Sequence, residues 1–236
     1  DGVGGVPAGV RVMDGAEILP RARIFPNGKG FGEGSYTGFS NLFRYHLLFR
    51  RGGWWFDMDC ISIRMLPAPD GLWMASSFEG KWGDCANCCA LHAPSGHSVI
   101  GRLCAEVEAV LRSGDLRFGH TGPHLLQRLI KEESLQACVA PWWEFSPYPQ
   151  QQIFLTAYQG NLAWMKNRAR HVKYFSRQCL RNDFHAGYIR SGTRVVHLHN
   201  ECWRADGRDK NARYHPACLY ERLKRRHGVA DPGSIP

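Results

Sequence analysis

The stretch SNLFRYHLLFRRGGWWFDMD, which runs from Ser40 to Asp59, decides how this chain folds. Apolar side chains recur every three or four residues in its first half, which predicts an amphipathic helix. Gly52 and Gly53 then end the helix, because glycine readily adopts the backbone conformation found at helix C-termini. The aromatic run from Trp54 to Phe56 predicts a short strand that is buried on both faces. A helix that leads into a buried strand is typical of an α/β domain.

Two carboxylates, Asp57 and Asp59, follow this strand with one residue between them. At strand spacing, side chains at i and i+2 point to the same face. Two converging carboxylates repel each other unless a cation lies between them, and Mg²⁺ and Mn²⁺ prefer oxygen ligands. A cation held in this way usually also binds substrate phosphates. The spacing therefore predicts a Mn²⁺ or Mg²⁺ site and a phosphate-bearing substrate.

The predicted helix carries a polar pair of its own. Thr37 or Ser40 is expected to cap its N-terminus. Ser40 and Arg44 are four residues apart, so they share one face of the helix. Arg44 lies between apolar neighbours, where a solvated charge is not expected. It is therefore either a functional residue or the structural partner of a core carboxylate.

Two later blocks have a recognisable pattern. In GHTGPHLL, residues 119–126, Thr121 can cap a helix and Pro123 can occupy its first turn, which leaves backbone N–H groups pointing outward. In VHLHN, residues 196–200, two histidines alternate along a predicted strand. Taken alone, that alternation is typical of half-buried polar residues, but together with the Asp-x-Asp block it favours a metal ligand.

These three blocks, in this order, resemble glycosyltransferase family 32, in which a serine-led helix with an internal Arg-Tyr runs into Gly-Gly, an aromatic strand and Asp-x-Asp. That family includes yeast initiating mannosyltransferases, lactosylceramide galactosyltransferases and bacterial capsule and lipopolysaccharide enzymes. The resemblance runs from about Val6 to His227. It implies a GT-A type fold, an α/β/α sandwich of Rossmann-like form. It also implies metal-dependent, retaining transfer of a hexose from a UDP- or GDP-hexose to a glycan or lipid-linked acceptor in surface polysaccharide synthesis.

The resemblance also assigns roles to residues. Asp59 would ligate the metal, Asp57 would contact the ribose or the metal through water, and Arg44 with Ser40 would orient the donor sugar. His197 or Asn200 would complete the metal site. The residues assigned to the donor are Ser40, Asn41, Arg44, Tyr45, Gly53, Asp57, Gly122, Pro123 and Trp203; those assigned to the metal are Asp57, Asp59, His197 and Asn200; those assigned to catalysis are Asp57, Asp59 and Arg44.

The chain departs from the family pattern at two positions. His199 stands where a tryptophan is more usual, so Trp203 is expected to take over the stacking role. Asn41 stands where family enzymes carry an aspartate, so its contact with a donor hydroxyl is expected to be weaker or altered.

Composition fits one domain over residues 1–236, with 44% hydrophobic residues and no apolar run of the ~20 residues that a membrane span requires. The net charge of +9 indicates an anionic partner, or an arginine-rich surface without such a role. The expected location is the cytoplasm. The basic run of Arg222, Lys224, Arg225 and Arg226 is compatible with peripheral contact with the inner face of an anionic membrane, but such a run is more often a solvated helix end. Nucleic acid is not an expected partner.

The chain opens on DGVGGVPAGV, where a nucleotide-binding α/β domain would already have completed a strand, a turn and a helix. We therefore expect an N-terminally truncated domain that lacks its first β-α unit. The remaining expected elements are strands at Val10–Met13, Cys60–Met65, Leu72–Ser77, Asn87–Leu91, Leu135–Ala140 and Thr193–Leu198, helices at His97–Arg112, Pro123–Lys131 and His215–Arg226, a short element at Ala16–Leu19, a glycine-rich loop at Arg21–Tyr36 and a weakly patterned segment at Phe154–Arg170.

Nine cysteines are spread along the chain, an odd count that argues against a disulfide framework and favours a reducing compartment. Cys85, Cys88 and Cys89, followed by His92 and His97, resemble a zinc cluster. No second cysteine pair follows at a suitable spacing, and two of these cysteines fall in a predicted buried strand, so zinc is disfavoured there.

A predicted loop over Trp142–Gln152 carries Trp142, Trp143 and Tyr148, which are candidates for stacking on an acceptor sugar or anchors for the loop itself. Two other classes of function remain open for the whole chain. One is a degenerate, non-catalytic module that holds a sugar nucleotide or a glycan. The other is a basic nucleic-acid-binding protein, which only the charge favours.

Overall fold

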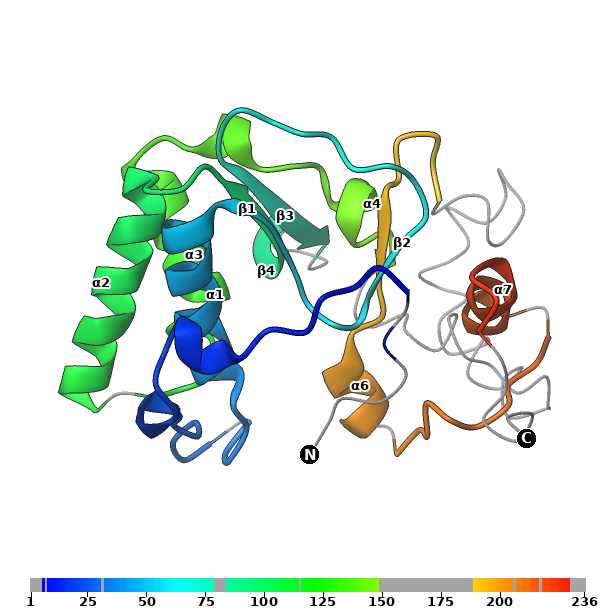
Figure 1. Cartoon of the computed structure of the whole chain (residues 1–236), viewed down its shortest axis with the longest axis horizontal. Helices are drawn as coiled ribbons and strands as arrows, with labels where there is room; N and C mark the ends of the chain where they lie inside the picture. Colours follow the sequence, from blue (N-terminus) through cyan, green and yellow to red (C-terminus); the bar gives the residue numbers. More distant parts are fainter. Residues whose placement is uncertain are drawn as a thin grey trace, which may run out of the picture. The chain divides into compact units, whose positions relative to one another are not determined.

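The computed structural model shows a mixed α/β protein (Figure 1). It describes residues 6, 8–30, 32–78, 84–114, 116–148, 189–205, 207–216 and 218–229. The chain forms two compact units, each built from two separate segments. Unit 1 comprises Asp1–Trp54 and His92–Arg128, and unit 2 comprises Trp55–Leu91 and Leu129–Pro236.

A pair of packed helices dominates unit 1. These are α1, Thr37–Arg51, and α2, Ser98–Ser113. Gly101 of α2 allows a close approach, because a Cβ at this position would lie 3.0 Å from the ring of Phe49. Each helix buries one apolar stripe, and complete burial of a leucine contributes roughly 1.5–3 kcal/mol. The buried apolar residues of the two stripes are Leu42, Tyr45, Leu48, Val99, Ile100, Leu103, Cys104 and Val107.

The N-terminus of α1 is capped from a distance. Neither Thr37 nor Ser40 caps it as predicted: the N-cap residue is Tyr36, and its side chain makes no capping hydrogen bond. Instead, the side-chain oxygen of Asn27 accepts a hydrogen bond from the Gly38 N–H at 3.0 Å. The Asn27 amide group also donates to the Thr37 hydroxyl at 2.6 Å. A loop residue ten positions upstream therefore supplies the cap that local sequence does not.

The C-terminus of α1 is as predicted. Gly52 is the C-cap, with φ of 68°, and its N–H donates to the Leu48 carbonyl. A Cβ on Gly52 would lie 2.6 Å from the backbone nitrogen of Ser95. Both the positive φ and the lack of space therefore favour glycine here.

Two small sheets complete the secondary structure. The first has three strands in the order β1-β4-β3, with β1 at Gly53–Phe56, β3 at Trp73–Phe78 and β4 at Asp84–Ala93. β1 is half-buried, so the prediction that it is buried on both faces is wrong. The second sheet pairs β2, Cys60–Ser62, with β5, Val195–His197, in antiparallel fashion.

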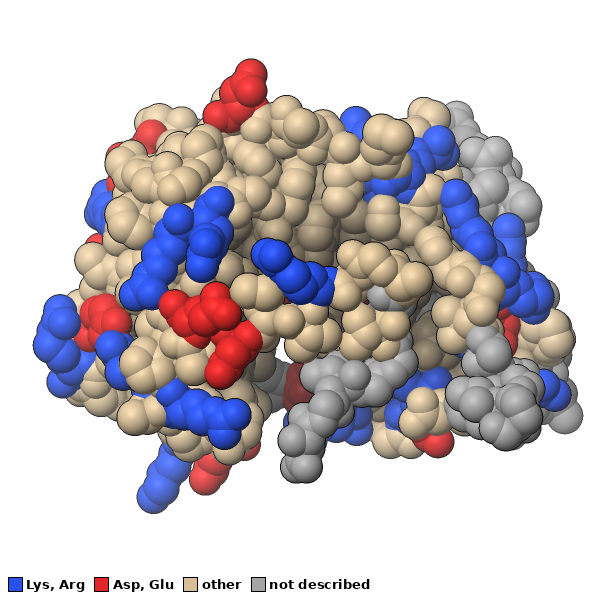
Figure 2. Space-filling view, viewed as in Figure 1, with Lys and Arg blue, Asp and Glu red and all other residues tan. Residues whose placement is uncertain are grey.

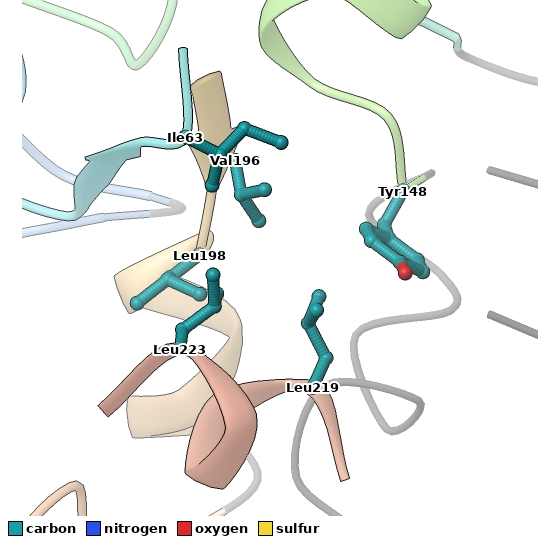
Figure 3. Packing of buried hydrophobic residues seen from close by; sticks show 6 residues of the cluster. All are labelled: Ile63, Tyr148, Val196, Leu198, Leu219 and Leu223. Atoms are coloured by element: carbon teal, nitrogen blue, oxygen red, sulfur yellow. The ribbon is translucent and has the colours of Figure 1, made fainter. Parts of the chain in front are cut away.

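Short helices surround these strands in unit 2. They are α4 at Trp142–Phe145, α6 at Asn200–Ala205 and α7 at Leu219–Arg226. Figure 3 shows Leu223 of α7 pointing toward Leu198 and Val196. This core cluster consists of Ile63, Tyr148, Val196, Leu198, Leu219 and Leu223.

Most predicted elements are found, with shifted ends. Helix α3 runs over Pro123–Glu132, and the predicted short element is the 3₁₀ helix η1, Gly15–Glu17. A second 3₁₀ helix, η2 at Arg21–Arg23, begins the predicted glycine-rich loop. β2 and β5 are shorter than predicted, and α7 begins four residues later than predicted.

Two predicted strands are wrong, and two short helices were missed. Val10–Met13 has no regular structure and is exposed, so no sheet partner fixes it. Residues 135–140 contain the 3₁₀ helix η4, Gln136–Cys138, and only an isolated bridge joins Val139 to Met74. Helix α6 was not predicted, and helix α4 occupies Trp142–Phe145, the start of the segment predicted to be a loop. The segment predicted over Phe154–Arg170 lies outside the described residues.

Among the described helices, none combines the length and apolar character needed to cross a membrane. Figure 2 shows basic side chains on several separate parts of the visible face, with acidic side chains among some of them. Some charged side chains of the described residues are paired, such as Arg23 with Glu108 and Arg128 with Glu106.

Candidate metal and donor site

The β2–β5 ladder brings two distant sequence blocks together within unit 2. Its register places Cys60 opposite His197, and the Leu198 N–H donates to the Asp59 carbonyl at 2.8 Å. Asp59 lies in the turn between β1 and β2, immediately before the ladder. Directly opposed residues of an antiparallel pair have Cβ atoms about 4.5–5.5 Å apart. The backbone therefore holds the end of the Asp-x-Asp block beside the histidines of the C-terminal block.

The Asp59 carboxylate is buried and hydrogen-bonded. One of its oxygens, Oδ2, lies 3.4 Å from His197 Nε2, and the same oxygen accepts the Asn200 N–H at 2.7 Å. Burial acts to raise the pKa of Asp59, but the hydrogen bond and charge of His197, together with the Asn200 N–H, outweigh it. The net pKa of Asp59 lies below its ordinary value, so this carboxylate is ionised at neutral pH.

His197 responds to the same pairing. Burial acts to lower the pKa of His197, whereas the hydrogen bond and charge of the Asp59 carboxylate act to raise it, and the net shift is upward. Its Nδ1 atom is buried and has no hydrogen-bond partner among the described residues. The His197 and His199 rings lie 4.1 Å apart, centroid to centroid.

Cys60 is the site residue that sequence reasoning missed. One potential ligand atom each from Asp59, Cys60 and His197 lies within 4.8 Å of the other two, and this is the one such group of three found in the described part of the chain. The Cys60 thiol also donates to the Cys89 carbonyl at 3.6 Å. The only sequence signal for Cys60 was its position directly after the Asp-x-Asp block.

Asp57 does not join this group. The indole N–H of Trp55 donates to its carboxylate at 2.9 Å, and its backbone N–H donates to the Cys89 carbonyl at 2.8 Å. The expected strand spacing of the two carboxylates is wrong, because β1 ends at Phe56 and residues 57–59 lead into a turn. A role for Asp57 at the metal remains a prediction.

Asn200 contributes its backbone rather than a metal contact. As the first residue of α6, it donates its N–H to Asp59, so this carboxylate lies at the N-terminus of the helix. Its predicted role as a ligand remains untested.

Unit 1 holds most of the residues assigned to the donor. Arg44 is buried and donates to the Ser40 hydroxyl at 2.9 Å and to the Ser40 carbonyl at 3.2 Å. The predicted pair on one helix face is therefore formed. Gly53 is the exposed first residue of β1.

The Gly-Pro segment packs against the same helix. The Asn41 amide donates to the Thr121 hydroxyl at 3.1 Å, and the Tyr45 hydroxyl donates to the Thr121 carbonyl at 3.1 Å. Gly122 and Pro123 follow directly, and Pro123 is the first residue of α3, as predicted. The structure thus brings Asn41 and Tyr45 next to the segment that the family resemblance singled out.

Trp203 and His199 both lie in the interior. The Trp203 ring is 1% exposed and packs edge-on against Tyr214 and Tyr220. His199 Nε2 lies 3.2 Å from both the Ser146 hydroxyl and the Tyr148 carbonyl. Stacking of Trp203 on a donor base remains a prediction, but in this structure core residues enclose its ring.

The aromatic residues of the predicted acceptor loop are also engaged. Tyr148 is fully buried in the core, which agrees with the loop-anchor alternative. Trp142 packs against Phe78, and the Arg190 guanidinium lies 5.4 Å from the ring centroids of both Trp142 and Trp143.

The cysteine-rich strand behaves as an apolar element. Cys88 and Cys89 are buried in β4, and neither forms a disulfide. The hydrogen bond with Cys60 and burial raise the pKa of Cys89 well above its ordinary value, so this thiol stays neutral. Within the described residues, none of Cys85, Cys88, His92 or His97 belongs to a three-residue group that could hold a metal.

Comparison with known proteins adds no assignment: no family model and no curated protein sequence matches the chain.

Proposed function

We propose that the chain is a retaining glycosyltransferase of the GT-A type, which transfers a hexose from a UDP- or GDP-linked donor to a glycan or lipid-linked acceptor. One observation carries this proposal. The Asp59 carboxylate accepts the N–H of Asn200, 141 residues further along the chain, beside His197. Asp59 ends the first of the three blocks that resemble family 32, and His197 and Asn200 lie in the last. Their proximity is what a shared donor site requires.

Of the two cations expected, Mn²⁺ fits the clustered residues better than Mg²⁺. The Asp59 carboxylate suits either ion, but the His197 imidazole suits a transition metal. When bound, such a cation would neutralise charge on the departing diphosphate. Asp59 and His197 would hold it.

The rest of the chemistry belongs to the donor and the acceptor. In a front-face reaction, the acceptor hydroxyl attacks the anomeric carbon from the side on which the diphosphate departs. The bond from that carbon to the diphosphate oxygen breaks, and the same oxygen takes the acceptor proton. Arg44, already oriented by its hydrogen bonds to Ser40, would contact donor hydroxyls. A trapped covalent glycosyl adduct would contradict this mechanism.

We place the reaction in the reducing cytoplasm, at the inner face of the membrane for a lipid-linked acceptor. None of the cysteines in the described ranges forms a disulfide, which fits a reducing compartment.

Calorimetric titration with UDP and GDP, each with and without Mn²⁺, tests the proposal. We expect one nucleotide to bind only when the cation is present. Asp59→Asn should abolish this binding and Asp57→Asn should weaken it. Asp70→Asn changes an exposed aspartate of unit 2 outside the cluster, so it should bind as the wild type does. Circular dichroism establishes that each variant is folded.

The other outcomes separate the alternatives. If neither nucleotide binds to folded wild-type protein, the transferase proposal fails. Binding without donor hydrolysis, in the presence of Mn²⁺ and a donor sugar, would identify a non-catalytic module. Salt-sensitive binding to nonspecific duplex DNA, with no cation requirement, would identify a nucleic-acid-binding protein.

A further inference from the structure

The donor set around Asp59 differs from the all-oxygen site that the sequence predicted. The grouped side chains offer one carboxylate oxygen, one thiol sulfur and one imidazole nitrogen. Mg²⁺ demands nearly octahedral oxygen coordination, and thiolate is a poor ligand for it. Thiolate and imidazole together are ligands that Zn²⁺ prefers.

The geometry is close to that of a small metal site. In tetrahedral coordination with metal–ligand distances of about 2.0–2.3 Å, neighbouring ligand atoms lie roughly 3.3–3.7 Å apart. The separation between Asp59 Oδ2 and His197 Nε2 is already 3.4 Å. Cys60 lies opposite His197 in the β2–β5 register, and its sulfur lies within 4.8 Å of the other two ligand atoms.

Burial and accessibility also suit an ion. The side chains of Asp59 and His197 are 9% and 11% exposed, while Cys60 is half-buried. The cluster is therefore shielded on the Asp59–His197 side and open at Cys60.

We propose that Asp59, Cys60 and His197 form a Zn²⁺ site with three protein ligands and an open coordination position. Three protein ligands and one exchangeable position are the arrangement of catalytic zinc, whereas structural zinc uses four protein ligands. The open position would accept water or an anionic oxygen. Zn²⁺ would take Asp59 and His197, the residues that the transferase proposal gives to Mn²⁺, so the two ions are alternative occupants of one site. The Zn²⁺ site depends only on the three clustered residues and does not require the chain to be a transferase.

Zinc affinity, measured on the full chain under reducing conditions by competition with a chromophoric chelator, tests this site. Cys60→Ser keeps the size and polarity of a half-buried side chain but removes the thiolate. We expect it to weaken Zn²⁺ binding by about 10-fold or more, the range over which changes around metal ligands act. Cys138→Ser, a change at another half-buried free cysteine of unit 2, is the matched control and should bind as the wild type does.

Substitution of Co²⁺ gives a second, independent readout. Wild-type protein should show a thiolate-to-cobalt charge-transfer band that Cys60→Ser lacks and Cys138→Ser keeps. His197→Gln should lose affinity with the band intact or weakened. Wild-type affinity and an intact band in Cys60→Ser would overturn the site, as would folded wild-type protein that binds no Zn²⁺. These titrations contain no nucleotide, so a failure of nucleotide binding leaves their result unchanged.

Discussion

At the residue scale, His199 shows how burial determines protonation. Its ring is enclosed, and burial, followed by the charge of His197, lowers its pKa to about 3, although the Tyr148 carbonyl acts in the opposite direction. In the folded protein the His199 ring therefore stays neutral, whereas in an unfolded chain it is protonated near its ordinary pKa of 6.5. Stability from this residue is present above pH 6.5 and is lost as the pH falls toward 3.

The corresponding prediction concerns His199→Asn. Asparagine tolerates the positive φ of 51° at this position, so the backbone can be kept. The wild-type free energy of unfolding should fall below pH 6.5 more steeply than that of the variant, by at most about 1.4 kcal/mol per pH unit. Urea unfolding of both proteins across this range measures the difference. Parallel curves would show that His199 does not titrate in this way.

Residue-level prediction from the sequence succeeded where a motif carried the information. The end of the Asp-x-Asp block and His197 were both singled out, and Asp59 and His197 are in contact. Cys60 was not found, because its position opposite His197 depends on a pairing between distant strands that local sequence does not encode. The direction of the Asp57 carboxylate was missed for a related reason: a turn replaces the expected strand spacing.

At the element scale, the cap of α1 gives a sharp prediction. The buried Asn27 amide group replaces the local cap with hydrogen bonds to Gly38 and Thr37. We expect Asn27→Ala to lower the free energy of unfolding by about 1–2 kcal/mol, the usual cost of losing an N-cap. Thr37→Ala should cost less, because the Thr37 hydroxyl accepts a hydrogen bond from the Asn27 amide group, whereas Asn27 itself accepts the Gly38 N–H of the helix. Urea unfolding compares the two, and a larger loss in Thr37→Ala would contradict this assignment.

Long periodic elements were predictable and short ones were not. The apolar repeat fixed α1 and α2 to within about two residues of their ends, the usual uncertainty of helix boundaries. The predicted strand over residues 135–140 failed, because a short apolar run is compatible with several local structures. The six-residue α6 carries too few residues for its repeat to be recognised.

At the scale of the whole molecule, each compact unit is discontinuous in sequence. The buried stripe of α1 needs α2, and α2 is supplied only after the first segment of unit 2. The α/β class followed from alternating helix and strand patterns. The interleaving of the two units could not be predicted from these patterns, because it depends on which distant segments pack together.

Because the two units are interleaved in sequence, we expect that cutting the chain at the loop after β4 gives two fragments that cannot fold independently. Expressed separately, fragments 1–95 and 96–236 should show no cooperative urea unfolding by circular dichroism, since α1 and α2 are then on different chains. Co-expression of the two fragments should restore a cooperative transition. Cooperative unfolding of fragment 1–95 alone would show that α1 does not need α2.

The same interleaving sets an order of events during synthesis. The ribosome delivers α1 first, then the segment Trp55–Leu91, and only afterwards α2. At about 5–20 residues per second, the apolar stripe of α1 stays uncovered for roughly a few seconds. During that interval the apolar stripe of α1 is exposed and can associate with other molecules. The speed of translation between these helices, and the chaperones near the ribosome exit, would therefore influence how much of the chain reaches its folded state.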